Sequence, residues 1–279
     1  MSFVHIGVKQ TEPSGIKGRC KAGSNVKIAL ASVHEYEEPC ISGKKGSGTV
    51  FFSHCNLQCE FCQNYQVSAQ GYGKEISIEE LANIFLWQQE QEVHNINLVS
   101  PTIYVPQIIE AIKIAKTKGL HIPIVYNTSG YERIETIKML NGYIDIYMPD
   151  FKYAEDDLAK QYSHIEQYSQ YAKKAICCMQ AQVGTPIFSE DGILQKGIVI
   201  RHLVLPNHIQ NTKKVINWLE KNMKEKAVIS IMAQYFPTYH AKQIPDLNRK
   251  LTKREYEKVA NYVYEKNFPY GYIQELRCT

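Results

Sequence analysis

Three of the eight cysteines are packed into one short segment of the chain. Cys55, Cys59 and Cys62 follow a C-x3-C-x2-C pattern, whereas the other five are scattered along the sequence. Thiolates are the ligands that iron–sulfur clusters prefer, and a loop of this length can wrap a cubane. Three cysteines would leave the fourth iron without a protein ligand, and catalysis requires such an open position. The spacing therefore predicts a 4Fe-4S cluster that can bind a further ligand.

Two other kinds of metal site also use closely spaced cysteines. A structural zinc site needs four ligands, and Cys40 or His54 could supply the fourth. However, zinc motifs usually pair two cysteine hairpins, and the sequence contains no second pair of this kind. An electron-carrying ferredoxin cluster needs four cysteines in the order C-x2-C-x2-C-x3-C, which is also missing. A non-catalytic iron–sulfur or zinc protein is the alternative to a catalytic cluster.

The composition is that of an ordinary globular protein. The chain has 279 residues, of which 44% are hydrophobic, and its net charge of +4 comes from 32 basic and 28 acidic residues spread along the sequence. Nucleic-acid binders usually concentrate their basic residues, so neither a nucleic-acid partner nor an RNA-modifying enzyme is favoured. No signal peptide and no apolar run of about 18 residues is found, so we expect a cytoplasmic protein with no membrane partner.

Short apolar runs alternate with amphipathic stretches through most of the chain. Buried strands are predicted over 48–53, 96–100, 122–126, 143–148, 197–205 and 227–232. Helices are predicted from Ser77, over 106–118, 132–140, 167–182 and 212–223, and from Thr252. Ser77 and Thr252 are each followed three residues later by a glutamate, which is the capping-box pattern. This alternation predicts right-handed βαβ units and an α/β fold with parallel strands.

Six such strands without a Gly-x-Gly-x-x-Gly motif favour a partial (β/α)6 TIM-like barrel over a dinucleotide-binding fold. We expect residues 46–279 to form the barrel domain, and residues 1–45 to form an N-terminal extension packed on it. Ligands bind such folds at the C-terminal ends of the strands. Residues that directly follow each predicted strand are therefore the candidates for a site.

The cysteine pattern, with Phe61 before its last cysteine and a strand before its first, resembles the radical S-adenosylmethionine (SAM) superfamily. Nearly the full chain is similar to an uncharacterised branch that resembles pyruvate formate-lyase activating enzymes. The similar segments are Gly18-Arg-Cys20, Glu37-Glu-Pro-Cys40, residues 46–66, Val99-Ser-Pro-Thr102, Tyr126-Asn-Thr-Ser-Gly130, Pro149-Asp-Phe-Lys152, Arg201-His-Leu-Val-Leu-Pro206 and Met232-Ala-Gln-Tyr-Phe-Pro237. The resemblance implies that SAM chelates the open iron through its methionyl amine and carboxylate. Reductive cleavage of SAM would then give a 5′-deoxyadenosyl radical that abstracts hydrogen from a substrate.

Residues that follow or lie within the later predicted strands, together with two residues of the cysteine loop, are candidates for binding the cofactor. They are Phe61, Asn64, Ser100, Pro101, Thr102, Asn127, Ser129, Lys152, Arg201 and Gln234. Residues 100–102 stand where relatives place Gly-Gly-Glu-Pro to bind the methionyl amine, and this chain departs from that pattern. A Lys or Arg inside a barrel is costly unless it meets an anion, so we expect Lys152 and Arg201 to bind the SAM carboxylate. An internal salt bridge with Asp150 is the alternative for both, and a polar turn is the alternative for residues 127–130.

The resemblance also implies the partners. One candidate substrate is the glycyl residue of a glycyl radical enzyme, and the alternative is a small molecule or a peptide. A flavodoxin or a ferredoxin is the expected electron donor. The insertion that carries extra clusters in some activating enzymes would need more clustered cysteines, and we expect Cys177 and Cys178 to be helix thiols rather than ligands.

Overall fold

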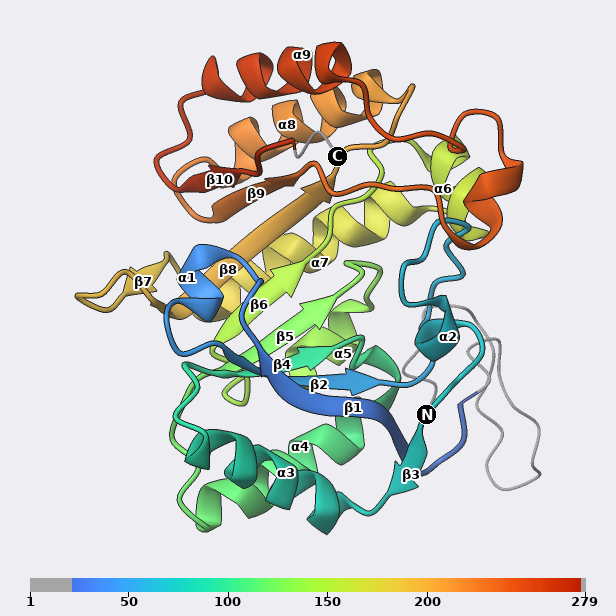
Figure 1. Ribbon diagram of the computed structural model, residues 1–279. Helices are drawn as coiled ribbons and strands as arrows, with labels where there is room; N and C mark the ends of the chain where they lie inside the picture. Colours follow the sequence, from blue (N-terminus) through green and yellow to red (C-terminus); the bar gives the residue numbers. More distant parts are fainter. Residues whose placement is uncertain (1–21, 277–279) are drawn as a thin grey trace.

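The computed structural model describes residues 22–276, and its centre is one mixed sheet (Figure 1). The strand order is β10-β9-β8-β6-β5-β4-β2-β1-β3, with β7 (Ile187–Phe188) paired to β8 off this path. Six strands correspond to the predicted ones and run parallel: β2 (Ser47–Phe52), β4 (Ile96–Val99), β5 (Ile124–Thr128), β6 (Ile146–Pro149), β8 (Leu194–Leu203) and β9 (Val228–Met232). The sheet stays open, because β10 (Gly271–Ile273) and β3 (Lys74–Ile76) lie at its two ends. The prediction of a partial barrel of parallel strands is confirmed.

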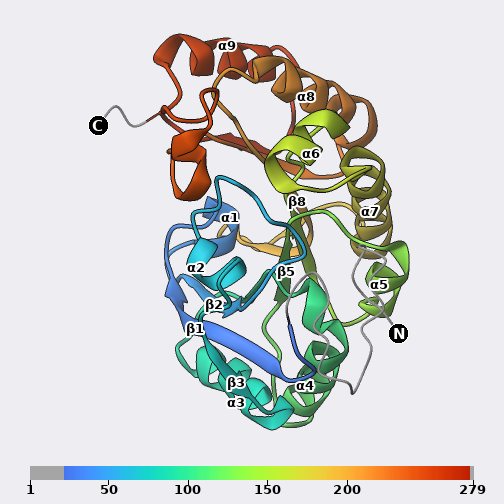
Figure 2. The same ribbon diagram turned by 90° about the vertical axis from the view of Figure 1, so that its right-hand side faces the viewer.

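The larger helices cover the outer face of this sheet and form an arc around it in Figure 2. They are α3 (Ile78–Glu90), α4 (Val105–Thr117), α5 (Ile134–Met139), α7 (Tyr168–Val183), α8 (Ile209–Met223) and α9 (Lys253–Tyr264). The short helix α6 (Asp156–Ser163) instead lies next to the loop after β2, where the Tyr162 carbonyl accepts from the Glu60 N–H. Both predicted capping boxes are present, since the Ser77 and Thr252 side chains accept from the backbone N–H three residues later. Helix α6 was not predicted. Within residues 22–276, no helix is long and apolar enough to cross a bilayer.

The segment before the barrel contributes to the same sheet. β1 (Val26–His34) pairs antiparallel with both β2 and β3, and the chain then runs through α1 (Pro39–Ser42). This strand was not predicted, and it shows that part of the expected N-terminal extension is hydrogen-bonded to the barrel. The domain boundary near residue 46 stays a prediction, and Cys20 and Cys278 lie outside the described residues.

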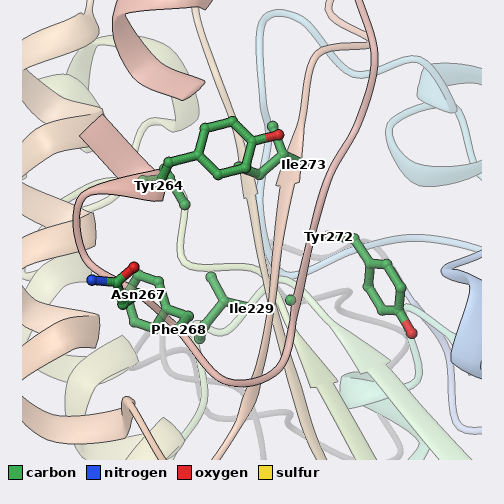
Figure 3. A pocket seen from close by; sticks show the side chains of 8 residues that line it. Ile229, Tyr264, Asn267, Phe268, Tyr272 and Ile273 are labelled. Atoms are coloured by element: carbon green, nitrogen blue, oxygen red, sulfur yellow. The ribbon is translucent and has the colours of Figure 1, made fainter. Parts of the chain in front are cut away.

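The last strand separates two environments. On its outer side, Ile229, Tyr264 and Phe268 line a groove of about 280 Å³, whereas the Tyr272 ring points to the opposite side of β10 (Figure 3). There Tyr272 shares a hydrogen bond with the buried Cys40 of α1. Side chains on this second side of β10 therefore face the chain between β1 and β2.

Candidate active site

The three clustered cysteines lie on the loop that follows β2, as the sequence predicts. Cys55, Cys59 and Cys62 are all partly exposed. Leu57 and Phe61, which alternate with them, are only 3% and 6% exposed and pack into the main core. The buried residues anchor the loop, and the cysteines are left at its surface.

Polar contacts hold these thiols in a partly desolvated place. Ser163 donates to Cys59 Sγ at 3.1 Å, and Cys62 Sγ lies 3.1 Å from Ser68 Oγ. Burial, with a smaller contribution from the neighbouring cysteines, raises the pKa of the Cys55 thiol to about 12 and that of Cys59 to about 11. Adjacent buried thiols lose their protons readily only when positive charge is bound to them. An iron–sulfur cluster would supply that charge.

The described residues form no single-ion site at the cysteine loop. Within the described part of the chain, no three His, Cys, Asp or Glu side chains converge in the geometry of a metal-ion site. Ligands of one zinc share one centre, whereas the thiolates of a cubane bind three different irons and therefore lie farther apart. Cys40, the proposed fourth zinc ligand, belongs to a separate core cluster, and the ring of His54 packs against Gly71.

A second group of predicted residues meets at the C-terminal ends of β5, β6 and β8. Asp150 follows β6 and accepts from Lys152 Nζ at 2.5 Å and from Arg201 Nε at 3.0 Å. Arg201 also donates to Asn127 Oδ1 at 2.7 Å and to Glu37 Oε2 at 3.2 Å. Both predicted cations thus pair with Asp150, which was the alternative to a SAM carboxylate. Their cofactor role stays a prediction.

Burial and the two cations of this network have opposite effects on the pKa values of its carboxyl groups. Burial raises the pKa of Asp150, but Lys152 and Arg201 more than offset that effect, so its pKa lies below the ordinary value. Burial also raises the pKa of Glu37, against the opposing effect of Arg201. The charge of Lys152 acts on Cys55 and Cys59 as well. The charge of this network therefore influences the cysteines of the loop.

The residues after β4 make hydrogen bonds to two different parts of the site. Ser100 has a left-handed backbone with φ +57°, and its N–H donates to the Asn127 carbonyl at 2.9 Å. Pro101 is buried, and the Thr102 hydroxyl donates to Glu132 at 2.7 Å. The Thr102 hydroxyl is thus already bonded to Glu132, whereas the backbone of Ser100 is held beside Asn127.

Glu132 is a site residue that sequence reasoning missed. Its Oε1 accepts from Thr102 at 2.7 Å, Thr128 at 2.5 Å and Tyr126 at 3.2 Å, while its Oε2 is buried without a hydrogen-bond partner among the described residues. Burial raises its pKa to about 7 in spite of these three hydrogen bonds. Glu132 therefore joins the chain after β4 to the end of β5. Its only sequence signal was a carboxylate closely following a predicted strand.

The remaining predicted residues border the cysteine loop. Ser129 donates to Asn56 Oδ1 at 3.1 Å, directly beside Cys55. Asn64 is exposed and precedes α2 (Tyr65–Ser68), and Gln234 is exposed after β9. Gln63 Nε2 donates to the Gln234 carbonyl at 3.2 Å, so the loop also touches the end of β9.

Residues 49–181 match the model of the radical SAM superfamily, a range that includes all three clustered cysteines and Lys152 but ends before Arg201 and Gln234.

Two curated relatives match different lengths of the chain. An uncharacterized protein of Methanocaldococcus jannaschii is 31% identical over 231 residues, covering 79% of this chain and 63% of that protein. A pyruvate formate-lyase-activating enzyme of Clostridium pasteurianum is 26% identical over 136 residues, covering 47% of this chain and 56% of the enzyme. The chain therefore spans less than two thirds of the length of either relative.

Solved structures of low identity share the fold. A methylornithine synthase superposes with a TM-score of 0.56 at 14% identity, covering 79% of this chain and 62% of that one. A radical SAM methyltransferase from Sphaerobacter thermophilus gives 0.55 at 12% identity, covering 81% and 65%.

Proposed function

Because the chain belongs to the radical SAM superfamily, we propose that it reductively cleaves SAM at a 4Fe-4S cluster held by Cys55, Cys59 and Cys62. The observation that carries this proposal is that the loop after β2 holds three neighbouring thiols and no fourth cysteine. A cluster held there would supply the electron for reductive cleavage of SAM to methionine and a 5′-deoxyadenosyl radical, which would abstract hydrogen from a substrate. The protein would orient SAM and the substrate for this reaction.

Lys152 is the better candidate for the SAM carboxylate. Its ammonium group has three N–H donors, of which one is directed to Asp150, and its charge acts on Cys55 and Cys59. A carboxylate that binds Lys152 would therefore lie beside the cluster. Arg201 already donates to three different side chains, and we assign it to holding Asp150 in place.

Asn127 and Ser129, both after β5, would border the ribose or the amino-acid part of SAM. The amide of Asn127 is fixed by Arg201, and the hydroxyl of Ser129 is fixed by Asn56. Groups held by such hydrogen bonds need little reorganisation when a ligand arrives, which favours precise orientation of the sulfonium. Ser100, with its left-handed backbone, is our candidate partner for the methionyl amine.

Two classes of hydrogen donor remain as proposals. Similarity to an activating enzyme over 47% of the chain supports a glycyl radical partner, with a flavodoxin or ferredoxin as the electron donor. A cavity of about 400 Å³ beside Arg201 and Gln234 favours the second class, which is a small molecule or a peptide side chain.

The test is anaerobic reconstitution with iron and sulfide, followed by dithionite and SAM. We expect about four irons and four sulfides per chain and release of 5′-deoxyadenosine. Cys59→Ala should lose the cluster and the product, whereas Cys177→Ala, which removes an exposed thiol of α7, should keep both. A protein that binds a cluster or zinc but never releases 5′-deoxyadenosine would instead be a non-catalytic metal protein. Equal iron loss in the two variants would contradict the ligand assignment.

A further inference from the structure

A cavity of about 400 Å³ opens between residues 36–39 and the strands β8, β9 and β10, and we name it the inner chamber. Arg201 of β8, Ser230 of β9 and Gln234 after β9 line it on one side, while Glu37 and Glu38 line it on the other. A volume of this size suits a small molecule or one long side chain. The chamber is therefore large enough to hold a substrate group.

Glu38 is the unusual residue of this chamber. Its side chain is 8% exposed, and its Oε2 is buried with no hydrogen-bond partner in residues 22–276. The backbone fixes its position, because the Glu38 carbonyl accepts from the N–H groups of Ile41 at 2.7 Å and Ser42 at 3.0 Å as α1 begins. A buried carboxylate oxygen without a donor is costly. A bound ligand that donates to it would remove that cost.

Glu37, next in the chain, differs from Glu38 in being fully engaged. Its two carboxylate oxygens accept from Asn97 and Arg201, each at 3.2 Å. Arg201 also donates to Asp150, so its guanidinium group is held by both carboxylates. The need for a donor inside the chamber is therefore specific to Glu38.

The local charges indicate which ligand would satisfy Glu38. Three carboxylates, those of Glu37, Glu38 and Asp150, act on Arg201, and Lys152 is the second cation of the group. These groups comprise three carboxyls and two basic side chains, and His34 is a further titratable neighbour of Glu37. A single ammonium group would supply positive charge to this surplus of carboxyls and donate the missing hydrogen bond to Glu38.

The chamber also adjoins the place where hydrogen abstraction would occur. Arg201 lines it and binds Asp150, which binds Lys152 next to the cysteine loop. On the β9 side, Gln234 lines it and accepts through its carbonyl from Gln63, the residue that follows Cys62. A group bound at Glu38 would thus extend toward the cluster loop.

We propose that the inner chamber is the substrate site, and that Glu38 binds a primary ammonium group of the substrate. The amine belongs to a free alkylamine or to a lysine side chain of a peptide. This assignment of the substrate rests on the proposed function, whereas the binding of an amine at Glu38 does not.

The experiment measures binding by the anaerobically reconstituted protein, without SAM, at about pH 8, where ordinary imidazoles are neutral and alkylamines are charged. Butylamine is compared with butanol and butyrate, and the peptide Gly-Gly-Lys-Gly-Gly with its norleucine analogue, by saturation-transfer NMR and titration. We expect the amine-bearing member of at least one series to bind and its neutral and anionic analogues not to bind. Binding by butylamine identifies a free amine, and binding by the peptide alone identifies a peptide. Binding by neither, or preferential binding of butyrate, would overturn the proposal.

A matched pair of variants locates the binding. Glu38→Gln should weaken amine binding by roughly tenfold or more, whereas Glu35→Gln, which removes the same charge from an exposed position three residues away, should not. Equal affinity in both variants would contradict the role of Glu38. The probe series on the unaltered protein decides the question even if Glu38→Gln folds poorly. Release of 5′-deoxyadenosine, measured separately, shows whether the proposed function holds independently of amine binding.

Discussion

The buried Glu132 should make the stability of the protein fall as the pH rises toward neutrality. Its pKa is raised by burial from 4.5 to about 7, since three hydroxyl donors on Oε1 do not offset the loss of solvent. Between these two values the folded protein keeps a proton that the unfolded chain releases. The stabilisation is complete below the unfolded value of about 4.5 and is lost as the pH rises through the folded value.

The expected size of this effect follows from the shift. Each pH unit between 4.5 and about 7 costs about 1.4 kcal/mol, so roughly 3 kcal/mol of the free energy of unfolding is lost across the interval. His202, whose pKa burial lowers to about 4, has an opposite effect, because the unfolded chain takes up a proton as the pH falls below about 6.5. The contribution of Glu132 to the pH dependence of stability is therefore isolated by comparing the wild type with a variant.

Urea unfolding of the wild type and of Glu132→Gln, followed by circular dichroism at several pH values, measures the difference. Gln cannot ionise, but its amide N–H groups meet no acceptor where Oε2 is unpartnered, so the variant should be less stable at about pH 4.5. The free energy of unfolding of the variant relative to the wild type should then rise by roughly 3 kcal/mol up to about pH 7.5. A difference that stays constant over this range would refute a protonated Glu132 in the folded protein.

Two further variants test the packing of the site by urea unfolding. Asp150→Asn removes the carboxylate shared by Lys152 and Arg201, and the two cations left behind should cost about 3–5 kcal/mol of stability, whereas Asp191→Asn in an exposed turn should cost little. Equal effects would show that the network carries no stability. Gly130→Ala would place a Cβ 2.2 Å from the Asp150 carbonyl, while Gly142→Ala has a similar φ (+82° against +78°) and no atom within 4 Å. The first should therefore destabilise by about 1–3 kcal/mol more than the second, and a smaller loss would mean that the ends of β5 and β6 are not packed as described.

The barrel could be predicted because its strands are buried on both faces. Such strands are short continuous apolar runs, and β5 is buried at every residue. β1 escaped prediction because it is a partly exposed strand near the sheet edge, with Leu30 52% exposed, so no face of it is uniformly apolar. β10 spans three residues and begins with a glycine, which is too short for any periodicity.

The cysteines could be identified from sequence because their spacing is local and lies on one loop. Of the partners of Arg201, Asp150 was anticipated as the alternative to SAM, but Glu37 could not be, since it lies 164 residues away along the chain and meets Arg201 only through the folded sheet. Position near the C-terminal ends of the strands places Asn127, Lys152 and Arg201 close together, but it does not decide which of several acceptors each side chain binds. Glu132 and Glu38 could not be singled out from the sequence. Only their burial in the folded protein distinguishes them from surface carboxylates.

In the proposed site, three cysteine sulfurs hold the cluster and SAM occupies the remaining iron. The most direct test is electron–nuclear double resonance on the reduced, reconstituted protein with SAM carrying ¹⁵N in its amine and ¹⁷O in its carboxylate. We expect couplings from both labels, showing that they bind iron, and their loss in Cys59→Ala together with the cluster signal. A signal that is unchanged by SAM, or a coupling from a fourth protein side chain, would contradict the account.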